Sequence, residues 1–171
     1  MTLISDEYKA QIRQMHQKKD WGKIGEQFAE AAAEIAKREG LKSILDYGCG
    51  KGRFADAMRA RGYEVTNYDP AMPEFAAHPE PHEFVTSFDV LEHIEPEHLE
   101  AVLVDLANLT QKLGMFTVAT RPAAKHLPDG RNAHLIVEAM PWWIDRLSKH
   151  FRIAAVPGGD ERQFVAFVEP K

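Results

Sequence analysis

An aspartate and three glycines alternate in one short stretch of the chain, "LDYGCGKGRF" (residues 45–54). Asp46 is followed by Gly48, Gly50 and Gly52 in a D-x-G-x-G-x-G pattern. Glycine costs backbone entropy on folding and offers no side chain for packing, so this density indicates a backbone that another group approaches closely. The pattern therefore predicts a ligand-binding loop.

A second group of reactive side chains lies in "FDVLEHIEP" (residues 88–96), which carries Asp89, Glu92 and His93. His93 is the natural general base, because the unperturbed pKa of histidine lies near working pH. A histidine that only braces its loop by hydrogen bonding is the alternative interpretation. Glu92 and a later histidine, His134 in "DGRNAHLIVEAM", complete the predicted catalytic set.

The D-x-x-E-H spacing of Asp89, Glu92 and His93 also suits a metal ion. Two carboxylates and an imidazole would hold Mg²⁺ or Mn²⁺ beside an acceptor hydroxyl. We expect no metal, and keep these three residues as the alternative ligand set.

Apolar periodicity places both groups within an alternation of helices and strands. Helices are predicted at 5–19, 24–39, 52–62, 96–113 and 140–151, and strands at 43–48, 63–69, 84–88, 114–120, 152–158 and 163–170. Residues 70–83 are proline-rich and show no convincing strand. The alternation predicts an α/β, Rossmann-like, doubly wound sheet. It would be mostly parallel, with seven strands, or six if a third strand is missing, and an antiparallel last strand.

Length and composition narrow the class of protein. The 171 residues fit one domain, which we divide into an N-terminal helical cap (1–40) and a cofactor-binding core (41–171). A single cysteine excludes an intramolecular disulfide. No apolar run approaches the roughly 20 residues that span a bilayer, and the N-terminus lacks the apolar region of a signal peptide. We therefore expect a cytoplasmic protein without a membrane partner.

Charge is unevenly placed along the chain. The formal net charge is -5, and residues 62–111 contain eleven Asp and Glu residues but no Lys or Arg. A nucleic-acid-binding protein usually shows the reverse, a basic stripe. A solvated acidic surface explains the excess, and nucleic acid becomes a less favoured partner.

The glycine loop follows a predicted strand and opens a predicted helix, the place where open α/β sheets bind ligands. Its pattern differs from the G-x-G-x-x-G of dinucleotide-binding loops, and an acid at the strand end suits a ligand with an ammonium group. Here the sequence resembles the class I S-adenosylmethionine-dependent methyltransferases. The resemblance rests on "LDYGCGKGRF", "VTNYDP" and "FVTSFDVLEHIEP", in the family's order, across about residues 41–120.

The resemblance implies S-adenosylmethionine as cofactor and S-adenosylhomocysteine as product. The glycines would wrap the methionine part, Asp46 would hold its amino group, and Asp69 would accept both ribose hydroxyls. Pro70, Ala71 and Met72 would lie near the adenine, and Ser87 and Phe88 near the sulfonium. The sequence departs from the family at 70–83, where family members commonly have a third strand and a further acidic residue.

The resemblance extends to metal-dependent O-methyltransferases with an E-x-x-E-H pattern, in which a later histidine takes part; His134 is the candidate here. Many relatives with D-V-L-E-H bind no metal.

The acceptor is not specified by the sequence. Tyr8, His16 and Trp21 in the N-terminal segment, and Arg121 and Arg131 in the loop at 120–135, are the predicted substrate-binding residues. We expect methyl transfer to an O or N atom of a small molecule, a sugar derivative or a side chain. An RNA or nucleotide methyltransferase, with or without a divalent metal, and a non-catalytic domain that binds cofactor or a partner are the alternatives.

Overall fold

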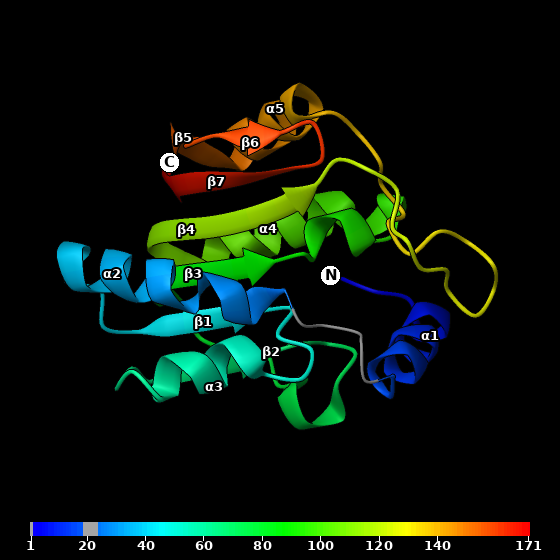
Figure 1. Cartoon of the computed structure of the whole chain (residues 1–171), viewed down its shortest axis with the longest axis horizontal. Coiled ribbons are helices and arrows are strands. Elements are labelled where there is room, and N and C mark those ends of the chain that lie inside the picture. Colours follow the sequence, from blue (N-terminus) through cyan, green and yellow to red (C-terminus); the bar gives the residue numbers. More distant parts are fainter. Residues whose placement is uncertain (1, 19–23) are drawn as a thin grey trace.

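The computed structural model describes residues 2–18 and 24–171, and a twisted β-sheet forms its centre (Figure 1). The strands are β1 (Ile44–Tyr47), β2 (Val65–Tyr68), β3 (His82–Phe88), β4 (Thr110–Ala119), β5 (Phe151–Ala155), β6 (Gly159–Asp160) and β7 (Gln163–Pro170). Their order is β2-β1-β3-β4-β7-β5, and β6 pairs with β7.

Strand directions confirm the predicted α/β fold. β1 pairs in parallel with β2 and β3, and β3 pairs in parallel with β4. β7 is antiparallel to both of its long neighbours, β4 and β5. β1 is buried along its whole length, as expected of a central parallel strand.

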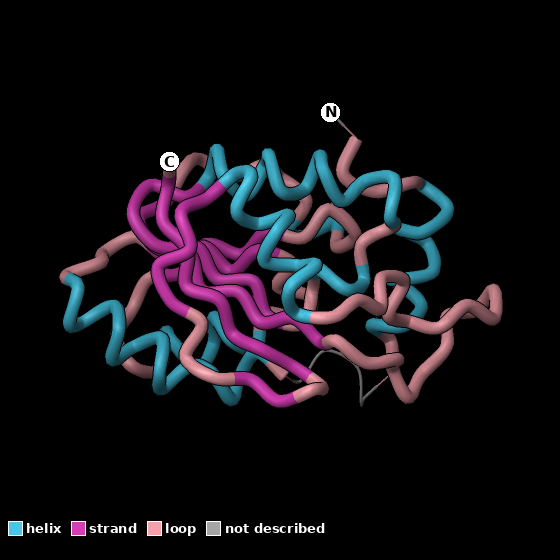
Figure 2. The backbone as a smooth tube through the Cα atoms, turned by 90° about the horizontal axis from the view of Figure 1, so that it is seen from above, coloured by secondary structure: helices cyan, strands magenta, loops and turns pink. Residues whose placement is uncertain are grey.

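Helices cover both faces of the sheet, which Figure 2 shows from above. Besides α1 (Asp6–His16), the α-helices of the described residues are α2 (Ala29–Glu39), α3 (Arg53–Arg59), α4 (Leu99–Leu109) and α5 (Met140–His150). α2 and α3 pack on one face, where alanines of α2 and Phe54 meet Ile44. α4 and α5 pack on the other face, where Leu103 and Trp143 meet Leu45. Adjacent residues of β1 thus point into opposite cores.

The helix predicted at 96–113 is shorter in the structure. A 3₁₀ turn (Pro96–His98) leads into α4, which ends at Leu109, and β4 begins at Thr110. The Thr110 hydroxyl donates a hydrogen bond to the Leu106 carbonyl and so satisfies one of the last carbonyls of the helix. The following residues then pair with β3.

The proline-rich segment forms no strand between residues 70 and 81, so β2 is an edge strand. A short 3₁₀ turn (Pro73–Phe75) lies there instead. The seventh strand is the two-residue β6, inside the turn that joins β5 to β7. None of the described helices is long and apolar enough to cross a membrane.

α1 lies apart from the two helical layers, beyond the carboxyl ends of the parallel strands (Figure 1). Ser5 caps the helix by accepting a hydrogen bond from the Tyr8 amide, and Ser5 itself binds the Glu95 carboxylate through its amide and hydroxyl. The loop that follows β4 occupies the same end of the molecule and packs Leu127 and Ala133 into a small core with α1. These two segments can therefore enclose whatever binds at the strand ends.

Candidate active site

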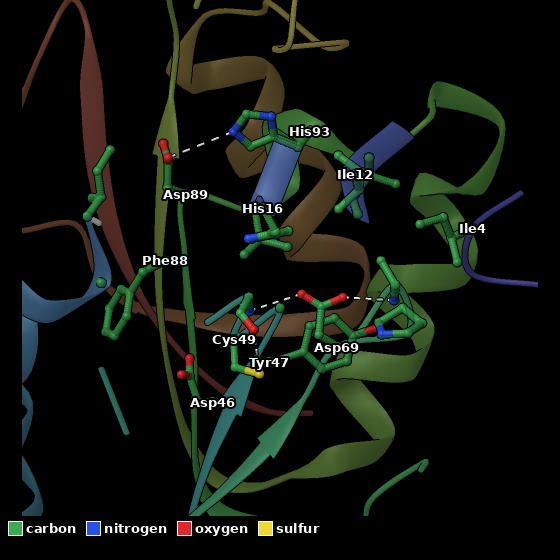
Figure 3. A pocket seen from close by; sticks show the side chains of 18 of the residues that line it. Ile4, Ile12, His16, Asp46, Tyr47, Cys49, Asp69, Phe88, Asp89 and His93 are labelled. Atoms are coloured by element: carbon green, nitrogen blue, oxygen red, sulfur yellow. Dashed lines mark hydrogen bonds and ion pairs between the residues drawn. The ribbon is translucent and has the colours of Figure 1, made fainter. Parts of the chain in front are cut away.

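A cavity of about 330 Å³ lies at this end of the sheet. The loop after β1 and the ends of β2 and β3 form its floor, and α1 and the loop after β4 form its walls. Figure 3 shows Asp46 and Asp69 toward one end and Asp89 and His93 toward the other. A volume of this size falls within the range of small-molecule sites.

The glycine loop needs glycine for two physical reasons. Gly48, Gly50 and Gly52 all have positive φ values, of 75°, 52° and 71°, where a side chain is strained. A Cβ atom on Gly48 would lie 2.6 Å from a Val90 methyl, and one on Gly50 would lie 2.5 Å from the His16 ring. The loop thus turns tightly and keeps its backbone exposed to the cavity.

Asp69 follows β2 and links the loop after β2 to the glycine loop after β1. Its Oδ2 accepts a hydrogen bond from the Gly50 amide at 3.0 Å, and its Oδ1 accepts one from the Ala71 amide at 2.9 Å. Burial raises the pKa of Asp69, although these amide hydrogen bonds favour the charged form. Each carboxylate oxygen keeps a second lone pair for a ligand hydroxyl.

Asp46 is the buried acid at the end of β1. Its Oδ2 has no hydrogen-bond partner among the described residues. Burial raises the pKa of Asp46 to about 8, and the nearby charge of Asp69 adds to the shift. An unpartnered buried carboxylate oxygen is costly, and an ammonium donor entering the cavity would satisfy it.

At the other end of the cavity, Asp89, His93 and His134 form a cluster in which one ligand atom from each residue lies within 4.8 Å of the others. His93 Nδ1 donates a hydrogen bond to the Ala133 carbonyl at 2.7 Å, and His134 Nδ1 donates one to the Arg121 carbonyl at 2.6 Å. The two rings meet edge to face, with centroids 4.8 Å apart.

The cluster also has a defined charge pattern. Burial alone would lower the pKa of His93, but the neighbouring Asp89 carboxylate raises it, with Nε2 and Oδ2 3.8 Å apart. Burial also opposes the charge on Asp89, but the contact with His93 holds the pKa of Asp89 below its ordinary value. Burial lowers the pKa of His134, so this imidazole stays neutral at neutral pH.

Glu92 lies behind the cavity wall and is completely buried. Its Oε1 accepts a hydrogen bond from the Ala119 amide at 2.7 Å, so the side chain braces the end of β4. Burial raises the pKa of Glu92 to about 8, with the charge of Asp89 adding to the shift. The structure therefore groups His134 with Asp89 and His93, where the D-x-x-E-H spacing had suggested Glu92.

The cavity wall holds most of the residues predicted from the sequence. They are Tyr8, His16, Asp46, Gly48, Gly50, Asp69, Pro70, Ala71, Phe88, His93, Arg121 and His134. The Tyr8 hydroxyl donates a hydrogen bond to the His93 carbonyl at 2.6 Å, which joins α1 to the cluster. The Nε atom of Arg121 is buried without a hydrogen-bond partner among the described residues.

Other predicted site residues do not line the cavity: Gly52, Met72, Ser87, Glu92 and Arg131. Gly52 precedes α3 and faces Asn67, Ser87 is fully buried, and the Arg131 guanidinium pairs with Asp129 outside the cavity. Trp21 lies outside the described residues.

The wall also contains residues that the sequence interpretation missed, among them Ile12, Tyr47, Arg53 and Val90. Tyr47, Arg53 and Val90 are sequence neighbours of the two motifs, so motif position could have revealed them. Ile12 enters the wall through the packing of α1, for which the sequence carries no local signal.

Known proteins give an independent view of the chain. A sequence profile described as "Methyltransferase domain" matches residues 13–154. The chain therefore belongs to this methyltransferase domain family, among the class I S-adenosylmethionine-dependent methyltransferases. No curated protein sequence matches the chain.

Solved structures of similar fold include two N-methyltransferases. One is the 1,6-didemethyltoxoflavin-N1-methyltransferase of Burkholderia thailandensis, with bound 1,6-didemethyltoxoflavin and S-adenosylhomocysteine. It is 17% identical, with a TM-score of 0.69, and the match covers 100% of this chain and 92% of that one. The other is NodS of Bradyrhizobium japonicum WM9 in complex with S-adenosylhomocysteine, 13% identical with a TM-score of 0.67, covering 96% and 99%.

A third similar structure is the magnesium protoporphyrin IX methyltransferase of Synechocystis PCC 6803 with bound S-adenosylhomocysteine. It is 16% identical, with a TM-score of 0.62, and the match covers 100% of this chain and 90% of that one. At these identities the likeness concerns the fold.

Proposed function

We propose that the protein transfers the methyl group of S-adenosylmethionine to an O or N atom of a small molecule, a sugar derivative or an amino-acid side chain. The observation that carries this proposal is that one and the same cavity begins at the glycine loop and Asp69 and ends at Asp89, His93 and His134. One end suits the cofactor, and the other suits an acceptor that must be oriented and lose a proton.

The residues at the first end fit the cofactor. Asp46 offers a buried, unpartnered oxygen to the amino group of the methionine part. The Asp69 carboxylate, held by the Gly50 and Ala71 amides, faces the same cavity and suits the ribose hydroxyls. Pro70 and Ala71 follow it in the wall, and the adenine would lie against them. When bound, the cofactor supplies a methyl group on a sulfonium leaving group.

Residues at the other end of the cavity would orient the acceptor and remove its proton. α1 and the loop after β4 supply part of the cavity wall, including Tyr8 and Arg121, and would restrict the access of water to the reacting atoms. The Asp89, His93 and His134 cluster activates the acceptor atom by favouring loss of its proton. Glu92 is a positioning residue, because it holds the end of β4 behind the cluster.

A small acceptor agrees with the size of the cavity and with the net charge of the chain. The cavity is about 330 Å³, and Arg53, Arg121 and Lys125 line it beside three aspartates, whereas the acidic stretch at residues 62–111 contains no Lys or Arg. Binding to a nucleic-acid backbone needs the opposite charge.

Calorimetric titration of S-adenosylmethionine into the full chain tests the proposal, with NADH as the comparison ligand. We expect binding of the sulfonium compound at one site per chain and no binding of NADH. In Asp69→Asn, which keeps the shape but removes the charge that strengthens the ribose hydrogen bonds, affinity should fall by at least about tenfold. A folded protein that binds no S-adenosylmethionine would refute the proposed function.

A further inference from the structure

We propose that Asp89, His93 and His134 bind a divalent first-row transition metal at the acceptor end of the cavity. The three side chains come from two distant parts of the chain, the turn after β3 and the loop after β4, and the fold brings them together. One possible ligand atom of each residue lies within 4.8 Å of the other two. All three residues also line the cavity, so a bound ion would face the acceptor.

The hydrogen bonds that orient the two histidine rings are already in place, as metal sites require. Metal-binding histidines usually donate their other ring N–H to a carbonyl or carboxylate, which fixes the tautomer and the direction of the ring. His93 Nδ1 and His134 Nδ1 each donate to a backbone carbonyl, of Ala133 and Arg121. Both rings are therefore fixed with Nε2 as the ligating atom.

The carboxylate is held by its backbone. Asp89 is the only described residue other than glycine with a positive φ, of 59°, which is a strained conformation that recurs at functional sites. Its amide donates a hydrogen bond to the Thr117 hydroxyl at 3.0 Å. These constraints fix the backbone of Asp89, and its Oδ2 lies 3.8 Å from His93 Nε2.

The distances suit closure around an ion. Ligand atoms bound at about 2.1 Å to one metal lie roughly 3 Å apart at neighbouring positions. The separation of 3.8 Å between Asp89 Oδ2 and His93 Nε2 exceeds this by less than 1 Å, and no separation in the cluster exceeds 4.8 Å. Asp89 and His93 are both partly exposed, so their side chains have room to rotate toward an ion. Small side-chain rotations would complete the site.

The donor set decides which ion fits. Two imidazoles and one carboxylate with open positions suit Zn²⁺, Mn²⁺, Fe²⁺ or Co²⁺ better than Mg²⁺, which prefers oxygen ligands. This differs from the set of two carboxylates and one histidine that the sequence spacing suggested. An open position toward the cavity would take an oxygen of the acceptor and lower its pKa, as a Lewis acid does. This role of the ion rests on the proposed function, and it narrows the methyl acceptor from an O or N atom to an oxygen atom.

Co²⁺ titration of the full chain tests the site, after removal of any tag with histidines and after treatment with a chelator. We expect one equivalent of Co²⁺ to bind, with visible d–d absorption bands of the ion whose position and intensity report its coordination by the protein. His134→Ala and Asp89→Asn should each weaken binding by roughly 100-fold. His126→Ala, an exposed histidine of the same loop, is the matched control and should bind Co²⁺ like the parent.

Circular dichroism on each variant checks that the chain is folded. A folded parent that binds no Co²⁺, or equal binding by parent and His134→Ala, would overturn the metal site. S-adenosylmethionine titrated into the same samples separates the two proposals. Cofactor binding without Co²⁺ binding rejects only the metal, whereas Co²⁺ binding without cofactor binding supports the metal site and rejects the proposed function.

Discussion

The glycine loop after β1 combines strained backbone with a lack of space. Gly48 has a φ of 75°, and a Cβ atom there would lie 2.6 Å from Val90. Gly40, at the end of α2, has a similar φ of 65° with nothing within 4 Å. This pair of glycines separates the cost of backbone strain from the cost of steric overlap at the site.

We predict that Gly48→Ala and Gly40→Ala each lose about 1–2 kcal/mol of stability from left-handed backbone strain. Only Gly48→Ala must also displace Val90 in the cavity floor, so only this variant should bind S-adenosylmethionine at least about tenfold more weakly. Urea unfolding and calorimetry measure the two effects. Equal cofactor affinity in both variants would contradict the role of the loop.

The pKa of Asp46 makes cofactor binding depend on pH. Burial and the nearby charge of Asp69 raise this pKa to about 8 in the protein without cofactor. Below that pH the carboxyl is mostly protonated, and pairing with the amino group of the cofactor then requires loss of the proton. Cofactor affinity should therefore rise with pH between about pH 6 and pH 7.5, approaching tenfold per unit.

Calorimetry at several pH values checks this dependence. Asp46→Asn, which cannot ionise, should bind more weakly and lose most of the rise. A slope that is the same in the parent and in Asp46→Asn would assign the dependence to another group.

The motif residues were predictable to different degrees. The spacing of the glycine loop predicted a ligand site at Gly48 and Gly50, because a loop that follows a parallel strand lies at the ligand-binding edge of the sheet. Asp69 was predicted from the resemblance to the methyltransferase family. Glu92 and His134 were not predictable in this way. The 3₁₀ turn Leu91–His93 sends Glu92 inward, and only the tertiary path of a long loop brings His134 to the cluster.

At the scale of elements, apolar periodicity predicted most of the helices and strands. It was wrong at residues 110–113, where the predicted helix is a strand in the structure. "TQKL" continues the helical spacing of α4, but pairing with β3 extends the strand backward into it. Nonlocal strand pairing overrode local helical preference there. The absence of a strand at residues 70–81 was predicted, because proline has no backbone N–H to donate to a neighbouring strand.

α1 forms part of the cavity wall, and the contacts that attach it to the rest of the chain give a prediction. The Ser5 hydroxyl accepts from the Tyr8 amide and donates to Glu95. Ser5→Ala removes the cap and should cost about 1 kcal/mol, which speeds hydrogen exchange of α1 amides about fivefold. Ser148→Ala, which removes an exposed hydroxyl on α5, is the control. Unchanged exchange in Ser5→Ala would mean that other contacts hold α1.

At the scale of the whole molecule, the packing of the helices indicates which of them belong to the N-terminal cap that we predicted at residues 1–40. α2 shares a core with α3 and the sheet, whereas α1 packs with the loop after β4. We propose that all 171 residues form one cooperative domain, with α1 alone as the cap. Sequence could supply the length and the elements, but the assignment of α2 to the sheet depends on packing that no local pattern reveals.

Calorimetric heating tests this proposal. We predict one unfolding transition, which S-adenosylhomocysteine at 100 times its Kd stabilises by about 2.7 kcal/mol. For a chain of this length that corresponds to a rise in Tm of about 5–10 °C. Two separate transitions, of which only one shifts, would show that the chain does not unfold as one unit.

The central claim is that one cavity holds the cofactor at the glycine loop and directs its sulfur toward the acceptor cluster. A crystal structure of the full chain with S-adenosylhomocysteine tests it most directly. The account predicts the ribose hydroxyls on Asp69, the amino group beside Asp46 and the sulfur pointing toward Asp89 and His93. S-adenosylhomocysteine bound elsewhere, or with its sulfur turned away from the cluster, would contradict it.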